Sequence, residues 1–328
     1  MCAAVGVFTQ LGDGELASVA TAFGLGEVTA SDAIAAGTIN SNYSLETARG
    51  RWFVRVNEGK AEADVAWESR YVESLAAGGV TTPPPEHATD GRPYAQLAEL
   101  RGKWISVFAW RPGRHLGPGE VTAERAADLG RALGDLHRVS LALPPAWRRG
   151  SIYDHPHLVA RFARFAASPD PLLAPAIAIL ADEIAAVEEG RSRRQRATHG
   201  IIHGDLFRDN VLWDGDELTA LLDFEQASGG SLAYDLAVCL NDWCWVDGPR
   251  LDLVAALLAG YQEVRPLTPG DREALPIEVR AAAMRFTITR ITDVYLAGVP
   301  NPDKDFRAFL ARCEAWRGPV LGQLRSLL

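Results

Sequence analysis

One short β-like segment, residues 198–224, interrupts a second half of the chain that otherwise has the periodicity of helices. Two apolar runs within it are joined by Asp214-Gly215-Asp216, which is typical of a tight hairpin turn. Polar residues stand at both ends of this hairpin. A strand-rich first part followed by helices with one polar β segment predicts two lobes with a cleft between them.

The first part, up to about residue 108, has strand-like patterns and one helix. The segments 41–47 and 51–56 are separated by three turn residues and predict a β-hairpin. Because side chains alternate along a strand, Phe53 and Arg55 share one face of the second strand. Trp52, Val54 and Val56 share the other face.

A helix and a second hairpin complete the predicted first lobe. Residues 61–77 carry apolar side chains at helical spacing, and 93–100 with 103–110 predict the hairpin. Arg111-Pro112-Gly113 then breaks the pattern as a candidate hinge. The helices predicted for the second part are 121–140, 156–190, 250–264, 276–297 and 304–327.

The charge of the 328-residue chain limits its partners. It has 33 Lys and Arg against 42 Asp and Glu, a formal net charge of -9. An acidic protein repels phosphate backbones and anionic lipid, so we expect neither a nucleic acid nor a membrane as partner. No apolar run reaches the roughly 18 residues of a membrane-spanning helix, and no signal peptide is recognisable, which favours a cytoplasmic location.

The chemistry is concentrated in the β-like segment. His203, Asp205 and Asn210 have the H-x-D-x-x-x-x-N spacing typical of a phosphotransferase catalytic loop. Asp223 closes the second strand of the hairpin. A hydroxyl nucleophile needs an acceptor for its proton, which a loop Asp supplies, and Mg²⁺ prefers oxygen ligands such as Asn210 and Asp223. His203 is expected to brace the loop. The alternative, that the acids are solvated turn residues, suits Asp214 and Asp216 only.

A charged residue stands on the otherwise apolar stripe of the helix at 61–77. This residue, Glu68, requires a cationic partner if it is buried. Arg55 on the inward-looking strand face is one candidate, and Lys60 in the preceding loop is the other. The segment Gly37-Thr38-Ile39-Asn40-Ser41-Asn42 is a candidate for the loop that covers phosphates.

These motifs give the chain a clear family resemblance. It resembles the aminoglycoside-phosphotransferase and choline-kinase-like superfamily, which has the protein-kinase fold, and within it the homoserine kinases. The matching stretches are AIAAGTINSNYSLET, HGDLFRDNV and YDLAVCLNDWCW. Phe207-Arg208-Asp209 and Asn40-Ser41-Asn42 favour homoserine kinase over aminoglycoside kinase.

The resemblance implies an α+β, two-lobed protein-kinase-like fold with an ATP-binding lobe at 1–109 and a helical lobe at 110–328. It implies ATP and Mg²⁺ as cofactors and a small-molecule hydroxyl acceptor, in this case homoserine of the threonine pathway. The residues it assigns are Asp205 as catalytic base, Asn210 and Asp223 as Mg²⁺ ligands, Glu68 as the helix carboxylate, Gly37, Asn40 and Asn42 at the phosphates, and Val107 and Ala109 at adenine.

Some assignments stay open at this point. The strand position that is usually Lys in this superfamily is Arg55, so either Arg55 or Lys60 contacts the phosphates. Glu225 is either a second metal contact or a group that positions the acceptor.

The acceptor site is also undecided. A zwitterionic acceptor needs a cation and an acid. The candidates are Arg208 and Asp209 beside the catalytic Asp, with Arg285, Arg290 and Asp293 farther along. Trp243 and Trp245 are expected in the core, the alternative being a cage for a choline-like amine.

Two other functions remain as alternatives. One is phosphorylation of an aminoglycoside, a choline-like amine or a sugar-like alcohol. The other is nucleotide binding without catalysis, which intact Asp205, Asn210 and Asp223 disfavour.

Overall fold

The structure is a computed structural model that describes residues 8–35, 39–299 and 301–328. The chain divides into two compact units. The first ends at Gly113 and also includes Thr219–Glu225, whereas the second comprises Arg114–Leu218 and Gln226–Leu328. The predicted boundary after residue 109 left Asp223 and Glu225 in the helical part, so the structure differs there, for a reason given below.

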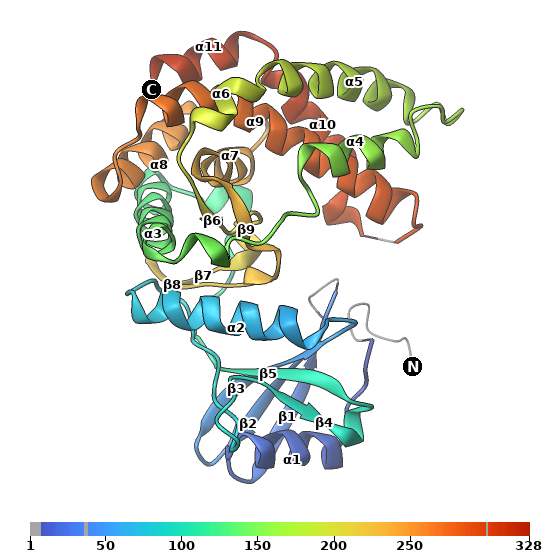
Figure 1. Ribbon diagram of the computed structural model, residues 1–328, viewed down its shortest axis with the longest axis vertical. Coiled ribbons are helices and arrows are strands. Elements are labelled where there is room, and N and C mark those ends of the chain that lie inside the picture. Colours follow the sequence, from blue (N-terminus) through green and yellow to red (C-terminus); the bar gives the residue numbers. More distant parts are fainter. Residues whose placement is uncertain (1–7, 36–38, 300) are drawn as a thin grey trace. The chain divides into compact units, whose positions relative to one another are not determined.

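The first unit is built on a five-stranded antiparallel sheet with the order β1-β2-β3-β5-β4 (Figure 1). The predicted hairpin of β2 and β3 forms, with Tyr43 opposite Val54 and Asn42 opposite Arg55. Of the second predicted hairpin only three residues of the first strand pair, because the chain then turns into a short 3₁₀ helix at Ala98–Leu100. The strands are β1 (Val28–Ile34), β2 (Ser41–Thr47), β3 (Gly50–Asn57), β4 (Ala95–Leu97) and β5 (Lys103–Ala109).

Two helices cover the two faces of this sheet (Figure 1). Leu16 and Val19 of α1 (Asp13–Ala22) pack in one core with Val54 and Val56 of β3. The prediction of a single helix in this part was wrong, because α1 is only ten residues long and buries only three side chains, too few for a clear stripe. The other face meets α2 (Glu62–Ala77), the predicted helix.

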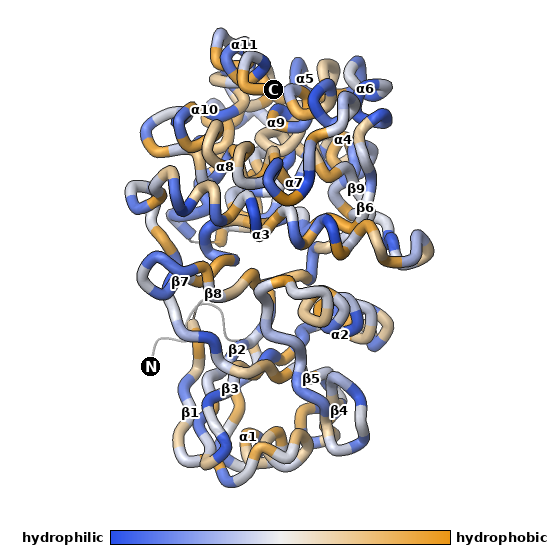
Figure 2. Tube along the Cα trace, turned by 90° about the vertical axis from the view of Figure 1, so that its left-hand side faces the viewer, coloured by the Kyte–Doolittle hydropathy of each residue, from blue (hydrophilic) through white to orange (hydrophobic). Residues whose placement is uncertain are grey.

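The second unit is mainly helical, and α9 (Pro269–Arg290) lies at its centre with α5, α6, α7 and α10 packed against it. Its described helices are α3 (Ala123–Ala142), α4 (His155–Ala163), α5 (Ala174–Glu189), α6 (Arg191–Arg196), α7 (Leu232–Trp243), α8 (Leu251–Val264), α9, α10 (Phe306–Ala315) and α11 (Pro319–Ser326). The tube of α6 is blue in Figure 2, since four of its six residues are arginine. No helix in the described residues is long and apolar enough to cross a membrane.

Four short strands interrupt these helices. β6 (His199–Ile202) pairs with β9 (Ser228–Ser231), and β7 (Val211–Asp214) pairs with β8 (Glu217–Leu221). The predicted hairpin around Asp214-Gly215-Asp216 is therefore present. β9 was not predicted, because its sequence SGGS has none of the apolar or β-branched residues that mark a strand.

The backbones of helices α3 and α8 pack closely at Gly130 and Gly260. A Cβ on Gly260 would overlap the backbone carbonyl of Ala127, and one on Gly130 would overlap that of Leu257. We expect Gly260→Ala to lower the free energy of unfolding by about 3 kcal/mol, the upper range for overpacking, because backbone rather than a flexible side chain must move.

Chemical denaturation measures this loss. Gly322→Ala on α11 is the matched control, since nothing lies within 4 Å of its added Cβ. That control should leave stability unchanged or raise it by up to about 1 kcal/mol. Equal stability of the two variants would contradict the close packing of α3 and α8.

Candidate active site

Asp235 of α7 holds the start of the predicted catalytic loop. Its fully buried carboxylate accepts hydrogen bonds from the backbone N–H groups of His203 and Gly204, each at 2.6 Å. His137 of α3 contacts the same carboxylate at 3.1 Å. Gly204 has φ +78°, a backbone conformation that a side chain would strain. Asp235 therefore sets the loop geometry, although it lies some thirty residues away in the sequence.

The loop leaves the Asp205 carboxylate available. This side chain forms no hydrogen bond or ion pair with any residue that the structure describes. Removal of water by the surrounding protein raises the pKa of Asp205, although Arg285 and His203 oppose the shift. The Asp205 N–H donates to Nδ1 of His203 at 3.3 Å, in keeping with the bracing role expected for His203. A carboxylate in this state is suited to accept a proton.

Arg285 of α9 also supports the loop. Its guanidinium donates to the carbonyl of Gly204 and to Oε1 of Gln226, and it lies 4.1 Å from the ring centre of Tyr153. Its position beside the apolar run 286–289 had made Arg285 a candidate for binding the acceptor. The structure instead gives it a positioning contact with the residue directly before Asp205.

A buried ion network occupies the first unit. Arg55 donates to Glu68 at 2.8 Å, and Lys60 lies 3.1 Å from the same carboxylate and 3.0 Å from Glu225. Burial opposes the charge of Arg55, but Asp223 and Glu68 raise its pKa above the usual value. Burial would raise the pKa of Glu225, yet Lys60 and Arg55 outweigh it and the pKa is lowered. The expected pair of Arg55 with Glu68 forms, and Lys60 joins it.

Asp223 lies two residues after β8 and belongs to the first unit. Its φ is +63°, and its carboxylate lies 3.6 Å from Arg55. Phe224 packs edge-on against Tyr71 of α2 at 5.9 Å, and the Leu221 N–H donates to the carbonyl of Thr81. These contacts explain why Thr219–Glu225 joins the first unit instead of the helical part.

The predicted metal ligands fit Mg²⁺ in their chemistry. Asn210 donates its amide nitrogen to the Asp205 carbonyl at 2.7 Å, and its amide oxygen has no hydrogen bond to a described residue. Asp223, which belongs to the first unit, offers a carboxylate, and each of these groups is a hard oxygen donor. No group of three or more His, Cys, Asp or Glu side chains capable of holding a metal occurs in the described part of the chain.

Several acceptor candidates are already engaged. Arg208 forms an ion pair with Asp242 at 3.0 Å, and Glu225 is held by Lys60 and by the Asn40 amide at 2.7 Å. Asp293 pairs with Arg161 at 2.6 Å. Of the candidates, Arg290 and Asp209 are left without an ion pair among the residues described.

The two tryptophans belong to packed structure. Trp243 is fully buried and donates its indole N–H to the carbonyl of Leu206 at 3.0 Å. Trp245 lies against the guanidinium of Arg312 at 4.7 Å. The expectation of a core role is thus confirmed for Trp243, whereas Trp245 is only partly buried.

Comparison with known proteins decides the family. The model of the phosphotransferase enzyme family matches residues 32–267, most of the chain. This chain belongs to that family. The expected phosphotransferase class is therefore confirmed.

Relatives and solved structures agree with the family. The chain is 36% identical to the homoserine kinase of Methylobacterium radiotolerans and 34% to that of Acidiphilium cryptum, over 88% of each chain. Among solved structures, a microcompartment-associated aminopropanol kinase superposes with a TM-score of 0.70 at 20% identity, covering 95% of this chain and all of the other. An amicoumacin kinase with AMP-PNP and Ca²⁺ superposes with 0.67 at 15% identity, covering 89% of this chain and 88% of the other. The expected α+β fold class is confirmed.

The remaining described residues that were predicted to contact adenine and the phosphates lie in or next to strands β2 and β5. Val107 is buried and pairs with Val54, and its carbonyl already accepts the N–H of Glu86 at 2.8 Å. Ala109 pairs with Trp52 at the end of β5. Asn42 is a strand residue of β2, whereas Asn40 precedes that strand. Gly37 lies outside the described residues.

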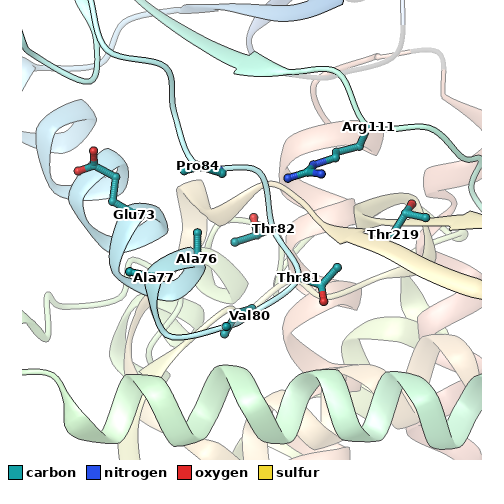
Figure 3. Close-up of a pocket in the computed structure, with 10 residues that line it drawn as sticks. Glu73, Ala76, Ala77, Val80, Thr81, Thr82, Pro84, Arg111 and Thr219 are labelled. Atoms are coloured by element: carbon teal, nitrogen blue, oxygen red, sulfur yellow. The ribbon is translucent and has the colours of Figure 1, made fainter.

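A hollow in the first unit contains none of the predicted site residues (Figure 3). It has a volume of about 630 Å³ and lies where α2 ends. Its lining is largely small or apolar and includes Ala76, Ala77, Val80, Thr82, Pro84 and Arg111. Glu73 also lines it but is paired with His87 at 2.5 Å, so we do not assign the phosphotransferase site to this hollow.

Proposed function

We propose that this phosphotransferase is an ATP-dependent homoserine kinase, which transfers the γ-phosphoryl group of ATP to the hydroxyl of L-homoserine. The observation that carries the proposal is similarity over nearly the whole length: curated homoserine kinases match at 34–36% identity over 88% of this chain and of their own. The solved neighbours, at 15–20% identity, support the fold but not an acceptor.

The available carboxylate of Asp205 supports its role as the base. As the acceptor oxygen bonds to the γ-phosphorus, the bond from that phosphorus to the β–γ bridging oxygen breaks and ADP leaves. Asp205 takes the hydroxyl proton in this step. Asp235 and Arg285 hold the loop backbone on either side of Gly204, so the carboxylate keeps its direction.

The cations of the first unit suit the nucleotide phosphates. We assign this role to Arg55 and Lys60, which Glu68 holds in place. Asn210 and Asp223 would hold Mg²⁺, which when bound neutralises charge on the phosphates. Asn40, fixed by Glu225, is assigned to the phosphate side.

Release of ADP from Mg·ATP in the presence of a panel of acceptors tests the proposed function. The panel is L-homoserine, choline, a few aminoglycosides and a sample without acceptor. We expect turnover of the order of 1–100 s⁻¹ with L-homoserine, the range of kinases, and background rates with the others. Selective turnover of another acceptor would refute the homoserine assignment and retain the phosphotransferase. Mg·ATP binding with no turnover of any acceptor would favour a nucleotide-binding protein.

A further inference from the structure

Two guanidinium groups flank one buried aromatic ring in the second unit. Arg290 of α9 lies 4.4 Å from the ring centre of Phe309, and Arg312 of α10 lies 4.5 Å from it. Phe309 is 1% exposed and stacks on Phe207 with an interplanar angle of 9° and ring centres 5.6 Å apart. Phe207 is two residues after Asp205, so this cluster adjoins the catalytic loop.

Neither guanidinium has a carboxylate within ion-pair distance among the described residues. Arg312 is satisfied by carbonyls, since it donates to those of Asn241 and Ala308. Arg290 is half-buried and has one hydrogen bond within the described structure, to the carbonyl of Asp305 at 3.1 Å. A guanidinium has five N–H donors, so several of those of Arg290 have no acceptor among the described residues. The planar arrangement of these donors suits a carboxylate.

Burial and neighbouring charges act on both guanidinium groups. Burial lowers the pKa of Arg312 to about 10; Asp242 opposes this shift, while repulsion from Arg290 and Arg208 adds to it. Burial likewise lowers the pKa of Arg290, although Asp242 and Asp209 oppose this. Asp242 already neutralises Arg208. Arg290 has no such direct partner among the described residues, so the carboxylate of a ligand could form the ion pair that it lacks.

An acid stands close by on the loop itself. Asp209 on the 3₁₀ turn Arg208–Asn210 is exposed and forms no ion pair with a described residue. Its charge acts on that of Arg290. The loop and the end of α9 therefore carry one available anion and one available cation, beside the available carboxylate of Asp205.

We propose that Arg290 binds the carboxylate of the acceptor and Asp209 binds its ammonium group, so that these two residues make the enzyme specific for an amino acid over an amino alcohol. This inference rests on the proposed function. Both ends of a zwitterion would find an opposite charge, and the hydroxyl end would be left to face Asp205. Arg208, Asp293 and Glu225 already form ion pairs within the protein, so we assign them structural roles.

Acceptors that lack one charge test the assignment. 3-Amino-1-propanol is homoserine without the carboxylate, and 4-hydroxybutanoate is homoserine without the ammonium group. Arg290→Gln should lower kcat/KM for L-homoserine by about 100-fold, the range for loss of a charged hydrogen-bonded contact, and leave 3-amino-1-propanol unchanged. Arg290→Lys should restore part of the loss. Asp209→Asn should lower kcat/KM for L-homoserine and leave 4-hydroxybutanoate unchanged.

Controls separate the possible failures. Arg191→Gln removes an exposed arginine of α6 that forms a surface ion pair with Glu188, and it should change no rate constant. An equal loss with homoserine and 3-amino-1-propanol in Arg290→Gln would overturn the proposal, because it would indicate a structural role. Unchanged homoserine kinetics would overturn it as well. Absence of homoserine phosphorylation by the unaltered protein would instead refute the proposed function before any variant is compared.

Discussion

Asp205→Asn is expected to lower kcat for L-homoserine by about 10³-fold, within the range that a positioned general base contributes. The amide has nearly the same shape as the carboxylate but does not accept the hydroxyl proton. The fold should persist, because the Asp205 side chain forms no bond with a described residue that holds the loop. Steady-state ADP release measures the loss, and calorimetric titration with Mg·ATP should show unchanged nucleotide affinity.

Asp214→Asn is the matched control for this loss. Asp214 is an exposed acid at the end of β7, nine residues along the same loop and hairpin, and turnover should stay within twofold of the unaltered protein. If Asp205→Asn retained more than a tenth of normal turnover with intact nucleotide binding, Asp205 would not be the base.

Asp223→Asn is expected to abolish Mg²⁺-dependent turnover and to weaken Mg·ATP binding, with a combined loss of more than about 100-fold in kcat/KM. An amide replaces the one carboxylate in the proposed ligand set. Asn is the better test than Ala because residue 223 has φ +63°, a conformation that Asn tolerates and Ala does not. The loss is measured by nucleotide titration with and without Mg²⁺.

Asp216→Asn serves as the control for Asp223. Asp216 lies in the same hairpin, and its ion pair with Arg125 at 2.9 Å is at the surface, where such pairs contribute little. We expect that control to keep normal Mg²⁺ dependence. Near-normal turnover in Asp223→Asn would refute the metal assignment, whereas loss of the folded state would be visible in its circular dichroism and would call for Asp223→Glu instead.

Elements with a strong local pattern were predictable. The hairpin of β2 and β3 and the helix α2 lie within two residues of their predicted bounds. In each of these segments the apolar residues alternate or recur at helical spacing, so the local sequence indicates the element. Prediction failed where the pattern is weak or the fold overrides it. α9 begins seven residues before its predicted start and continues through Pro276, whose missing hydrogen bond is tolerated in a helix buried on several sides.

The candidate site divides in the same way. The spacing of Asp205, Asn210 and Asp223 was enough to propose their chemistry. Asp235, Arg285 and Asp242 were not predicted as supports of the loop, because their contacts with it join residues more than thirty positions apart. The motif YDLAVCLNDWCW contains Asp235 and Asp242, so the resemblance marked the right helix without showing what its acids bind.

The sequence alone therefore determined the phosphotransferase chemistry, which depends on residue type and spacing within a short segment, and the family resemblance implied the fold class. It left Arg55 and Lys60 as alternative partners of Glu68, and folding brings both to it. The tertiary structure decided which charged side chains are already held in ion pairs. Arg208 and Arg290 are equivalent in sequence as candidate cations, but folding places Arg208 3.0 Å from Asp242 and leaves Arg290 with a carbonyl and an aromatic ring. The carboxylate that holds Arg208 comes from a distant part of the chain, so only the folded structure distinguishes the two arginines.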